Sequence, residues 1–178
     1  MLPDILERDL AVVFCGTAAG TTSAARGHYY AGLGNEFWRF LHESGLTPTL
    51  LSPQQDTMLP RFGIGLTDVA KNVAQSHDRG LDPFYDIESL IDKMTTYTPA
   101  WIAFHGKEAA RVVSRSVGRG RDIWYGEQQW RVADARVFVV PSASAANREP
   151  RDEERRRRRL DGRDQRVDWF RELAARSR

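Results

Sequence analysis

Short apolar runs recur along the chain and alternate with segments of helical periodicity. Uninterrupted apolar runs occupy residues 11–15, 101–104 and 137–140, and a weaker run occupies residues 64–69. Strands that are apolar on both faces are typical of parallel or mixed sheets that helices cover on each side. The four runs are therefore predicted to be strands of a buried central sheet.

The intervening segments carry the apolar spacing of amphipathic helices. Helices are predicted over residues 35–45, from the cap Asp86 to the residues before Pro99, and over residues 107–117 and 160–176. Alternating apolar residues between 122 and 132, around Gly126 and Glu127, predict a β-hairpin.

Strands that alternate with helices in this way favour an α/β fold. We expect a three-layer α/β/α sandwich with a short, mainly parallel central sheet. The length of 178 residues favours one domain over residues 1–178, with residues 149–178 forming an arginine-rich C-terminal helix packed on it or extending from it.

Composition narrows the class of protein. With 41% hydrophobic and 28% charged residues, the chain is neither disordered nor membrane-spanning. The single cysteine, Cys15, excludes a disulfide framework and indicates a reducing, cytoplasmic location. Four scattered histidines lack metal-ligand spacing, so no metal site is predicted. No membrane partner is predicted either.

Charge is distributed unevenly along the chain. Residues 148–178 hold 12 arginines against 8 acidic residues, whereas the rest of the chain is slightly acidic. Such a basic end fits a polyanionic partner. The arginine run at 155–159 adjoins acidic residues, so a solvated, partly self-neutralised helix face remains the alternative.

Ligands of open parallel sheets bind at the carboxyl ends of the strands. Those ends are predicted to hold the loop 16–20, Asp68, residues 105–107 and residues 141–144. The loop lacks the glycine patterns of dinucleotide-binding and P-loop proteins. A small-molecule hydrolase ranks last, because the chain has neither GxSxG nor a convincing Ser-His-Asp order.

A series of segments, in order and with similar spacing, resembles the uracil-DNA glycosylase superfamily. The closest branch is that of mismatch-specific uracil-DNA glycosylase and thymine-DNA glycosylase. The segments are VVFCG at 12–16, GHYYAGLGNEFW at 27–38, HESGL at 42–46, GIGLTDV at 63–69, AFHGK at 103–107 and VPSASA at 140–145.

The resemblance implies roles for individual residues. Tyr30 would stack on a flipped base, and the loop from Pro141 to Arg148 would hold the DNA backbone and fill the vacancy left by flipping. The implied base-binding residues are Gly16, Thr17, Ala18, Ser23 and Tyr30. The implied DNA-binding residues are Lys107, Ser142, Ser144, Ala145, Ala146, Asn147 and Arg148.

Two positions depart from the family pattern. Ala18 stands where the family usually has an asparagine that positions water, and Ala146 stands where a leucine or arginine wedge is common. Asn147 or Arg148 would have to replace that wedge. Asp68 is our candidate for the catalytic group, since a carboxylate can stabilise a cationic sugar and orient water. The alternatives for Asp68 are a helix cap or an ion pair with Lys71.

The resemblance implies a monofunctional enzyme of base excision repair that removes uracil from DNA without a cofactor. Its substrate would be double-stranded DNA that contains uracil, and single-stranded DNA is a further candidate. The enzyme would also bind the abasic product, and it would be a monomer. A slow or non-catalytic binder of uracil or abasic DNA is the alternative. Secondary roles stay open for His105 (site residue or backbone-bonded), Lys107 (phosphate contact or solvated) and Asn35 (helix cap or DNA contact).

Overall fold

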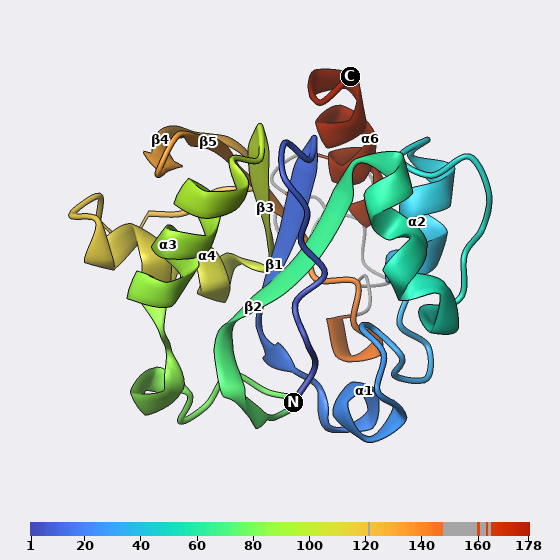
Figure 1. Ribbon diagram of the computed structural model, residues 1–178, viewed down its shortest axis with the longest axis horizontal. Coiled ribbons are helices and arrows are strands. Elements are labelled where there is room, and N and C mark those ends of the chain that lie inside the picture. Colours follow the sequence, from blue (N-terminus) through green and yellow to red (C-terminus); the bar gives the residue numbers. More distant parts are fainter. Residues whose placement is uncertain (121, 148–159, 161–162, 164) are drawn as a thin grey trace.

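A five-stranded sheet forms the centre of the molecule, with the strand order β2-β1-β3-β5-β4 (Figure 1). The computed structural model describes residues 1–120, 122–147, 160, 163 and 165–178. The neighbouring strands are parallel except β4, which runs antiparallel to β5. The strands are β1 (Val12–Ala19), β2 (Ile64–Ala74), β3 (Trp101–His105), β4 (Gly126–Val132) and β5 (Ala135–Val140).

Helices cover both faces of this sheet. The α-helices are α1 (Thr21–Arg26), α2 (Phe37–Glu43), α3 (Ile87–Tyr97), α4 (Lys107–Ser116) and α6 (Arg166–Arg176). Three 3-10 segments accompany them, η1 (Pro53–Phe62), η2 (Asp82–Phe84) and η3 (Ala145–Asn147). The predicted three-layer α/β/α sandwich with a mainly parallel sheet is confirmed. No helix of the described residues is long and apolar enough to cross a bilayer.

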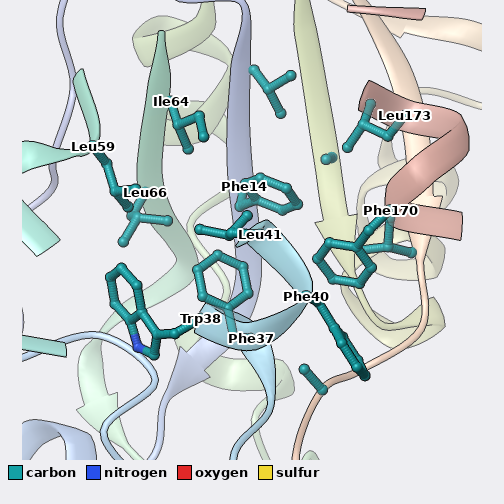
Figure 2. Close-up of a cluster of buried hydrophobic side chains, with 14 of the residues drawn as sticks. Phe14, Phe37, Trp38, Phe40, Leu41, Leu59, Ile64, Leu66, Phe170 and Leu173 are labelled. Atoms are coloured by element: carbon teal, nitrogen blue, oxygen red, sulfur yellow. The ribbon is translucent and has the colours of Figure 1, made fainter. Parts of the chain in front are cut away.

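The alternation of side chains along β1 divides the core into two halves. Val12 and Phe14 pack with α2 and α6 on one face, whereas Val13 and Cys15 pack with α3 and α4 on the other. Figure 2 shows the first half, in which aromatic rings dominate. Phe14 meets Phe37 edge-on at 5.2 Å between ring centroids. Each buried aromatic side chain of this kind contributes roughly 1.5–3 kcal/mol through the hydrophobic effect.

The predicted helix starts rest on side-chain caps. Asp86 accepts a hydrogen bond from the Ser89 amide at 3.0 Å, and Asn35 accepts one from the Phe37 amide at 3.0 Å. Each bond satisfies an amide that has no partner within its own helix. Helix α3 ends at Thr98 in the left-handed conformation, just before Pro99. The N-cap of α2 is however Glu36, so Asn35 is not the cap that the sequence predicts and contacts the first helical amide from the position before it.

The first two strands extend beyond their apolar runs, which corrects two predictions. Residues 16–19 continue β1 and do not form a loop, and Asp68 lies inside β2 rather than at its carboxyl end. Pairing between the two strands explains the extension. Gly16 pairs with Asp68 and Ala18 with Ala70, before the register shifts at Ala19. Backbone hydrogen bonds thus hold small and polar residues in a strand.

Two further boundaries differ from the prediction. The antiparallel hairpin joins β4 to β5, so its turn lies at Ala133 and Asp134 and not at Gly126 and Glu127. Ala133 adopts the left-handed conformation that a tight hairpin turn requires. The last helix begins at Arg166 rather than at residue 160. The predicted Arg148 contact and the arginine run at 155–159 lie outside the described residues.

Candidate active site

A cavity of about 540 Å³ opens along β1, β2, β3 and the segment that follows β5. It gathers residues that are distant in the sequence. From the predicted catalytic and base-binding set, the cavity is lined by Gly16, Thr17, Ala18, Ser23, Tyr30 and Asp68.

The predicted DNA-binding residues meet the same cavity from another side. Lys107, Ser142, Ser144, Ala146 and Asn147 line it. Ala145 is not part of the lining, and its side chain lies 3.1 Å from where a side-chain carbon on Gly34 would stand.

Asp68 is buried, with 5% of its surface exposed, and it faces a strand that has no side chain at the paired position. A side-chain carbon added to Gly16 would lie only 2.7 Å from Asp68 Oδ1 and 3.8 Å from the Tyr30 hydroxyl oxygen. Non-bonded carbon and oxygen atoms do not approach that closely without displacement. The glycine therefore makes room for the carboxylate beside Tyr30.

Burial sets the electrostatic state of this carboxylate. Removal from water raises the pKa of Asp68 from 3.8 to about 6, against the opposing charge of Lys71. The Lys71 ammonium lies 4.0 Å from Asp68 Oδ2. With a pKa near 6, Asp68 is mainly ionised at neutral pH, yet it is a far better proton acceptor than an exposed aspartate.

Lys71 is held mainly by other partners. Its ammonium lies 2.9 Å from Asp4 Oδ1 and donates a hydrogen bond to the Tyr29 hydroxyl at 2.8 Å. Lys93 lies 2.7 Å from the other oxygen of Asp4. The ion pair with Asp68 is thus longer than the ion pair of Lys71 with Asp4. The helix-cap alternative for Asp68 fails because the residue lies within β2.

The N-terminal segment supplies Asp4, which the sequence patterns did not single out. Ile5 pairs with Leu66 through two backbone hydrogen bonds of 2.9 and 2.8 Å, which adds this segment to the free edge of β2. Figure 1 shows the segment running beside β2. Thr67 also donates a hydrogen bond to Asp4 at 2.7 Å. The segment thereby fixes the cation nearest to the candidate catalytic carboxylate.

Tyr30 stands on an aromatic support. Its ring stacks on Phe37 with centroids 3.8 Å apart and an interplanar angle of 27°, and it lies 4.8 Å from the His105 ring. Among the described residues its buried hydroxyl has no hydrogen-bond partner. A buried hydroxyl without a partner is costly, and this oxygen is closed off from solvent, so a ligand would reach it only after its surroundings rearrange.

The backbone of Tyr30 is strained, with φ at 51°. Its two neighbours hold it in place. Asp56, a buried residue, accepts a hydrogen bond from the Tyr29 amide at 3.1 Å, and the Ser23 hydroxyl accepts one from the Ala31 amide at 3.0 Å. Ser23 therefore lines the cavity but also anchors the turn that presents Tyr30.

His105 is hydrogen-bonded to the backbone, which is the second of the two roles that the sequence left open for it. Its Nε2 accepts a hydrogen bond from the Ala143 amide at 2.9 Å, so the ring proton is assigned to Nδ1. Burial, with a smaller effect of the Arg166 charge, lowers the pKa of His105 to about 3. The ring is therefore neutral throughout the physiological range.

The segment 142–147 is fixed from within. The Ser142 hydroxyl accepts a hydrogen bond from the Ser144 amide, and the Ser144 hydroxyl accepts one from the Ala146 amide, both at 3.3 Å. The Asn147 side-chain amide donates to the Ser142 carbonyl at 2.9 Å. Neither serine hydroxyl donates a hydrogen bond within the part of the chain that the structure describes, so both protons suit an external acceptor.

Arg166 anchors this segment to the core, and sequence analysis missed it. It is buried, and its guanidinium donates to the carbonyls of Ser142 at 2.9 Å and Ser144 at 3.3 Å. It also pairs with the Glu36 carboxylate. The arginine-rich end of the chain thus contributes a structural arginine in addition to any surface charge.

A further wall of the cavity comes from residues 75–78, which the sequence did not indicate. The Gln75 amide donates to the Ala19 carbonyl at 2.8 Å, and the Thr17 hydroxyl donates to Asp78 Oδ1 at 2.6 Å. Across the cavity, the Lys107 ammonium lies 4.2 Å from the Tyr125 ring centroid. Within the described ranges, no group of three or more histidine, cysteine or acidic residues could hold a metal ion.

Comparison with known proteins places this chain in a family. The chain is similar over 97% of its length to the solution NMR structure of a "putative Uracil DNA glycosylase" from Methanosarcina acetivorans, of which 96% is covered. The two share 21% sequence identity and a TM-score of 0.59, a likeness of fold. The family model of the uracil DNA glycosylase superfamily matches residues 3–170. The chain belongs to the uracil DNA glycosylase superfamily.

Proposed function

We propose that this protein is a monofunctional DNA glycosylase that removes uracil from DNA by hydrolysing the N-glycosidic bond. Membership of the superfamily supports a glycosylase-type function. The observation that carries the finer proposal is the buried carboxylate of Asp68, which lines the cavity across from Gly16 and beside Tyr30. The motifs of the chain favour the mismatch-specific branch of the superfamily.

The size of the cavity supports base flipping. About 540 Å³ is ample for a single base with its sugar, whereas a DNA duplex about 20 Å across cannot enter. An enzyme that acts on such a base must first extrude it from the stack. Tyr30, supported from one side by Phe37, lines the cavity and offers its ring to the extruded uracil.

The chemistry follows from the position of the carboxylate. The bond between C1′ and N1 breaks, and its electron pair leaves with N1 as the uracil anion. The sugar then carries positive charge, which the Asp68 carboxylate stabilises. Water forms the new bond to C1′ and gives its proton to Asp68, from which it passes to solvent or to the released base. A positioned base of this kind contributes typically 10²–10⁴-fold.

The DNA backbone would be held at the opposite side of the cavity. The free hydroxyl protons of Ser142 and Ser144 suit phosphate oxygens, and Lys107 adds a positive charge beside them. Arg166 keeps the segment in one conformation, so little order is lost when phosphate binds. The partner we propose is uracil-containing double-stranded DNA, bound by a monomer.

One observation favours a second candidate, a binder that turns over slowly or not at all. Ala18 lines the cavity where the family usually has an asparagine, and its methyl group cannot orient water. Incubation with a uracil-containing duplex, followed by alkali, separates the two functions. Strand cleavage at the uracil supports the glycosylase, whereas a shifted band without cleavage supports the binder. A duplex with cytosine in place of uracil is the control.

A further inference from the structure

An exposed leucine stands close to the mouth of the cavity. Leu33 has 83% of its surface exposed, the largest fraction among the large hydrophobic side chains of the described residues. A single exposed leucine is ordinary on a protein surface. Its meaning therefore depends on how firmly it is held and on what lies beside it.

The backbone around Leu33 is fixed at several points. The Asn35 amide donates to the Gly32 carbonyl at 3.1 Å, which closes a turn with Leu33 at its tip. Gly34 adopts the left-handed conformation with φ at 71°. The Glu36 amide donates to the Ala143 carbonyl at 2.9 Å. The leucine is thus presented on an anchored turn.

The turn lies against the proposed DNA-binding segment. A side-chain carbon on Gly34 would stand 3.1 Å from the Ala145 side chain, so the two segments are in close contact. Gly32 on one side and Ala146 on the other both line the cavity. Leu33 is therefore at the rim where an extruded nucleotide would leave the duplex.

Within the described residues 142–147, the neighbouring segment has no side chain suited to fill the space that the nucleotide leaves, and Arg148 lies outside the described residues. Ala146 ends in a methyl group, which is too short to replace a base. The Asn147 amide is engaged with the Ser142 carbonyl at 2.9 Å and would have to break that bond to reach outward. Apolar side chains such as leucine are known to insert between base steps and to unstack them.

We propose that Leu33 is the wedge that enters the DNA stack and occupies the place of the flipped nucleotide. The wedge thus comes from the turn that follows Tyr30, not from the segment 142–147. This inference rests on the proposed glycosylase function. It assigns to one short segment, residues 30–33, both the stacking ring and the residue that keeps the base from returning.

The test compares Leu33→Ala and Leu33→Met with a matched control, Leu50→Ala, which truncates another exposed leucine that does not line the cavity. Single-turnover excision is measured on a uracil-containing duplex and on the same strand unpaired. We expect Leu33→Ala to lower the ratio of duplex to single-strand rate by about tenfold or more, because only the duplex must be held open. Leu33→Met and Leu50→Ala should keep the wild-type ratio.

A fluorescence measurement tests the role of Leu33 as a wedge without requiring uracil excision. In an Asp68→Asn background, 2-aminopurine next to the uracil of the duplex reports unstacking, and adding Leu33→Ala should abolish most of the increase. An unchanged duplex rate together with an unchanged fluorescence increase overturns the wedge. So does an equal loss on both substrates without a fluorescence change. A wild-type protein that excises uracil from neither substrate overturns the proposed function, and the wedge with it.

Discussion

Gly16 and Asp68 face one another across the parallel pair of β1 and β2, so closely that a methyl group on Gly16 would stand 2.7 Å from the Asp68 carboxylate. The Asp68 carboxylate can thus occupy its position only because the paired residue in the neighbouring strand is a glycine, which has no side-chain carbon. The same methyl group would lie 3.8 Å from the Tyr30 hydroxyl oxygen, so both functional groups share the space that the glycine leaves.

Gly16→Ala is expected to lower uracil excision by two orders of magnitude or more, because the carboxylate must move by several tenths of an ångström or rotate. Single-turnover kinetics on a duplex measures the loss, and circular dichroism checks the fold. Gly20→Ala is the matched control. Its added methyl would lie at an ordinary 3.6 Å from the Ser76 hydroxyl, so a loss as large as that of Gly16→Ala would refute the argument.

The rate of excision should fall on the acid side of about pH 6. Burial raises the pKa of Asp68 to about 6, and only the ionised carboxylate can accept a proton or stabilise the cationic sugar. Below that pH the single-turnover rate is expected to drop about tenfold per pH unit. His105 does not supply this limb, because burial lowers its pKa to about 3. A pH–rate profile that is flat between pH 5 and 8 would contradict the assignment.

Lys71→Met tests the origin of this pKa. Lys71 is the main charge that opposes the effect of burial on Asp68, so its removal should move the acid limb to higher pH. Lys93→Met is the matched control, since Lys93 acts on Asp68 with the smaller effect while it contacts the same Asp4. We expect a smaller displacement of the limb for Lys93→Met. Equal displacements, or none, would show that Lys71 does not set the pKa.

Asp68→Asn should stabilise the folded protein above neutral pH. The pKa of the Asp68 carboxyl group rises from 3.8 in the unfolded protein to about 6 in the folded protein. The folded protein therefore loses stability as the pH rises through that interval. The full effect is about 3 kcal/mol by the usual conversion of pKa shifts. Urea unfolding at pH 8 should therefore show a higher free energy of unfolding for the variant, and the difference should shrink towards pH 4. A variant that is less stable at pH 8 would indicate a structural role for the carboxylate.

The sequence was sufficient to predict the layers of the fold but not the ends of its strands. Apolar runs such as 137–140 identify buried strands because both faces of the sheet are covered. Residues 16–19 and 70–74 lack such a run, and they form strand only because each pairs with the other. A pairing between distant segments leaves no mark in the local pattern. The hairpin turn at 133–134 was placed wrongly for a different reason: Gly126 has the positive φ of a turn residue, at 94°, but it begins β4, and Ala133 forms the turn.

The candidate site could be predicted where a motif carried it. Gly16 and Tyr30 follow from the resemblance, and Asp68 follows from carboxylate chemistry and an expected place at a strand end; all three line one cavity, although Asp68 lies within β2. Asp4 and Arg166 were missed, since their partners lie far away in the sequence and an isolated charged residue resembles any surface residue. Only the packed structure shows that one holds Lys71 and the other the segment 142–147.

Single-turnover excision of uracil from a duplex by Asp68→Asn tests the central claim most directly. Asparagine has nearly the same shape as aspartate but can neither take up the proton of water nor balance the cationic sugar. The account predicts a rate lower by 10²–10⁴-fold, with duplex affinity preserved, because the segment 142–147 and Tyr30 are untouched. Excision at the wild-type rate by a folded Asp68→Asn protein would show that the chemistry resides elsewhere.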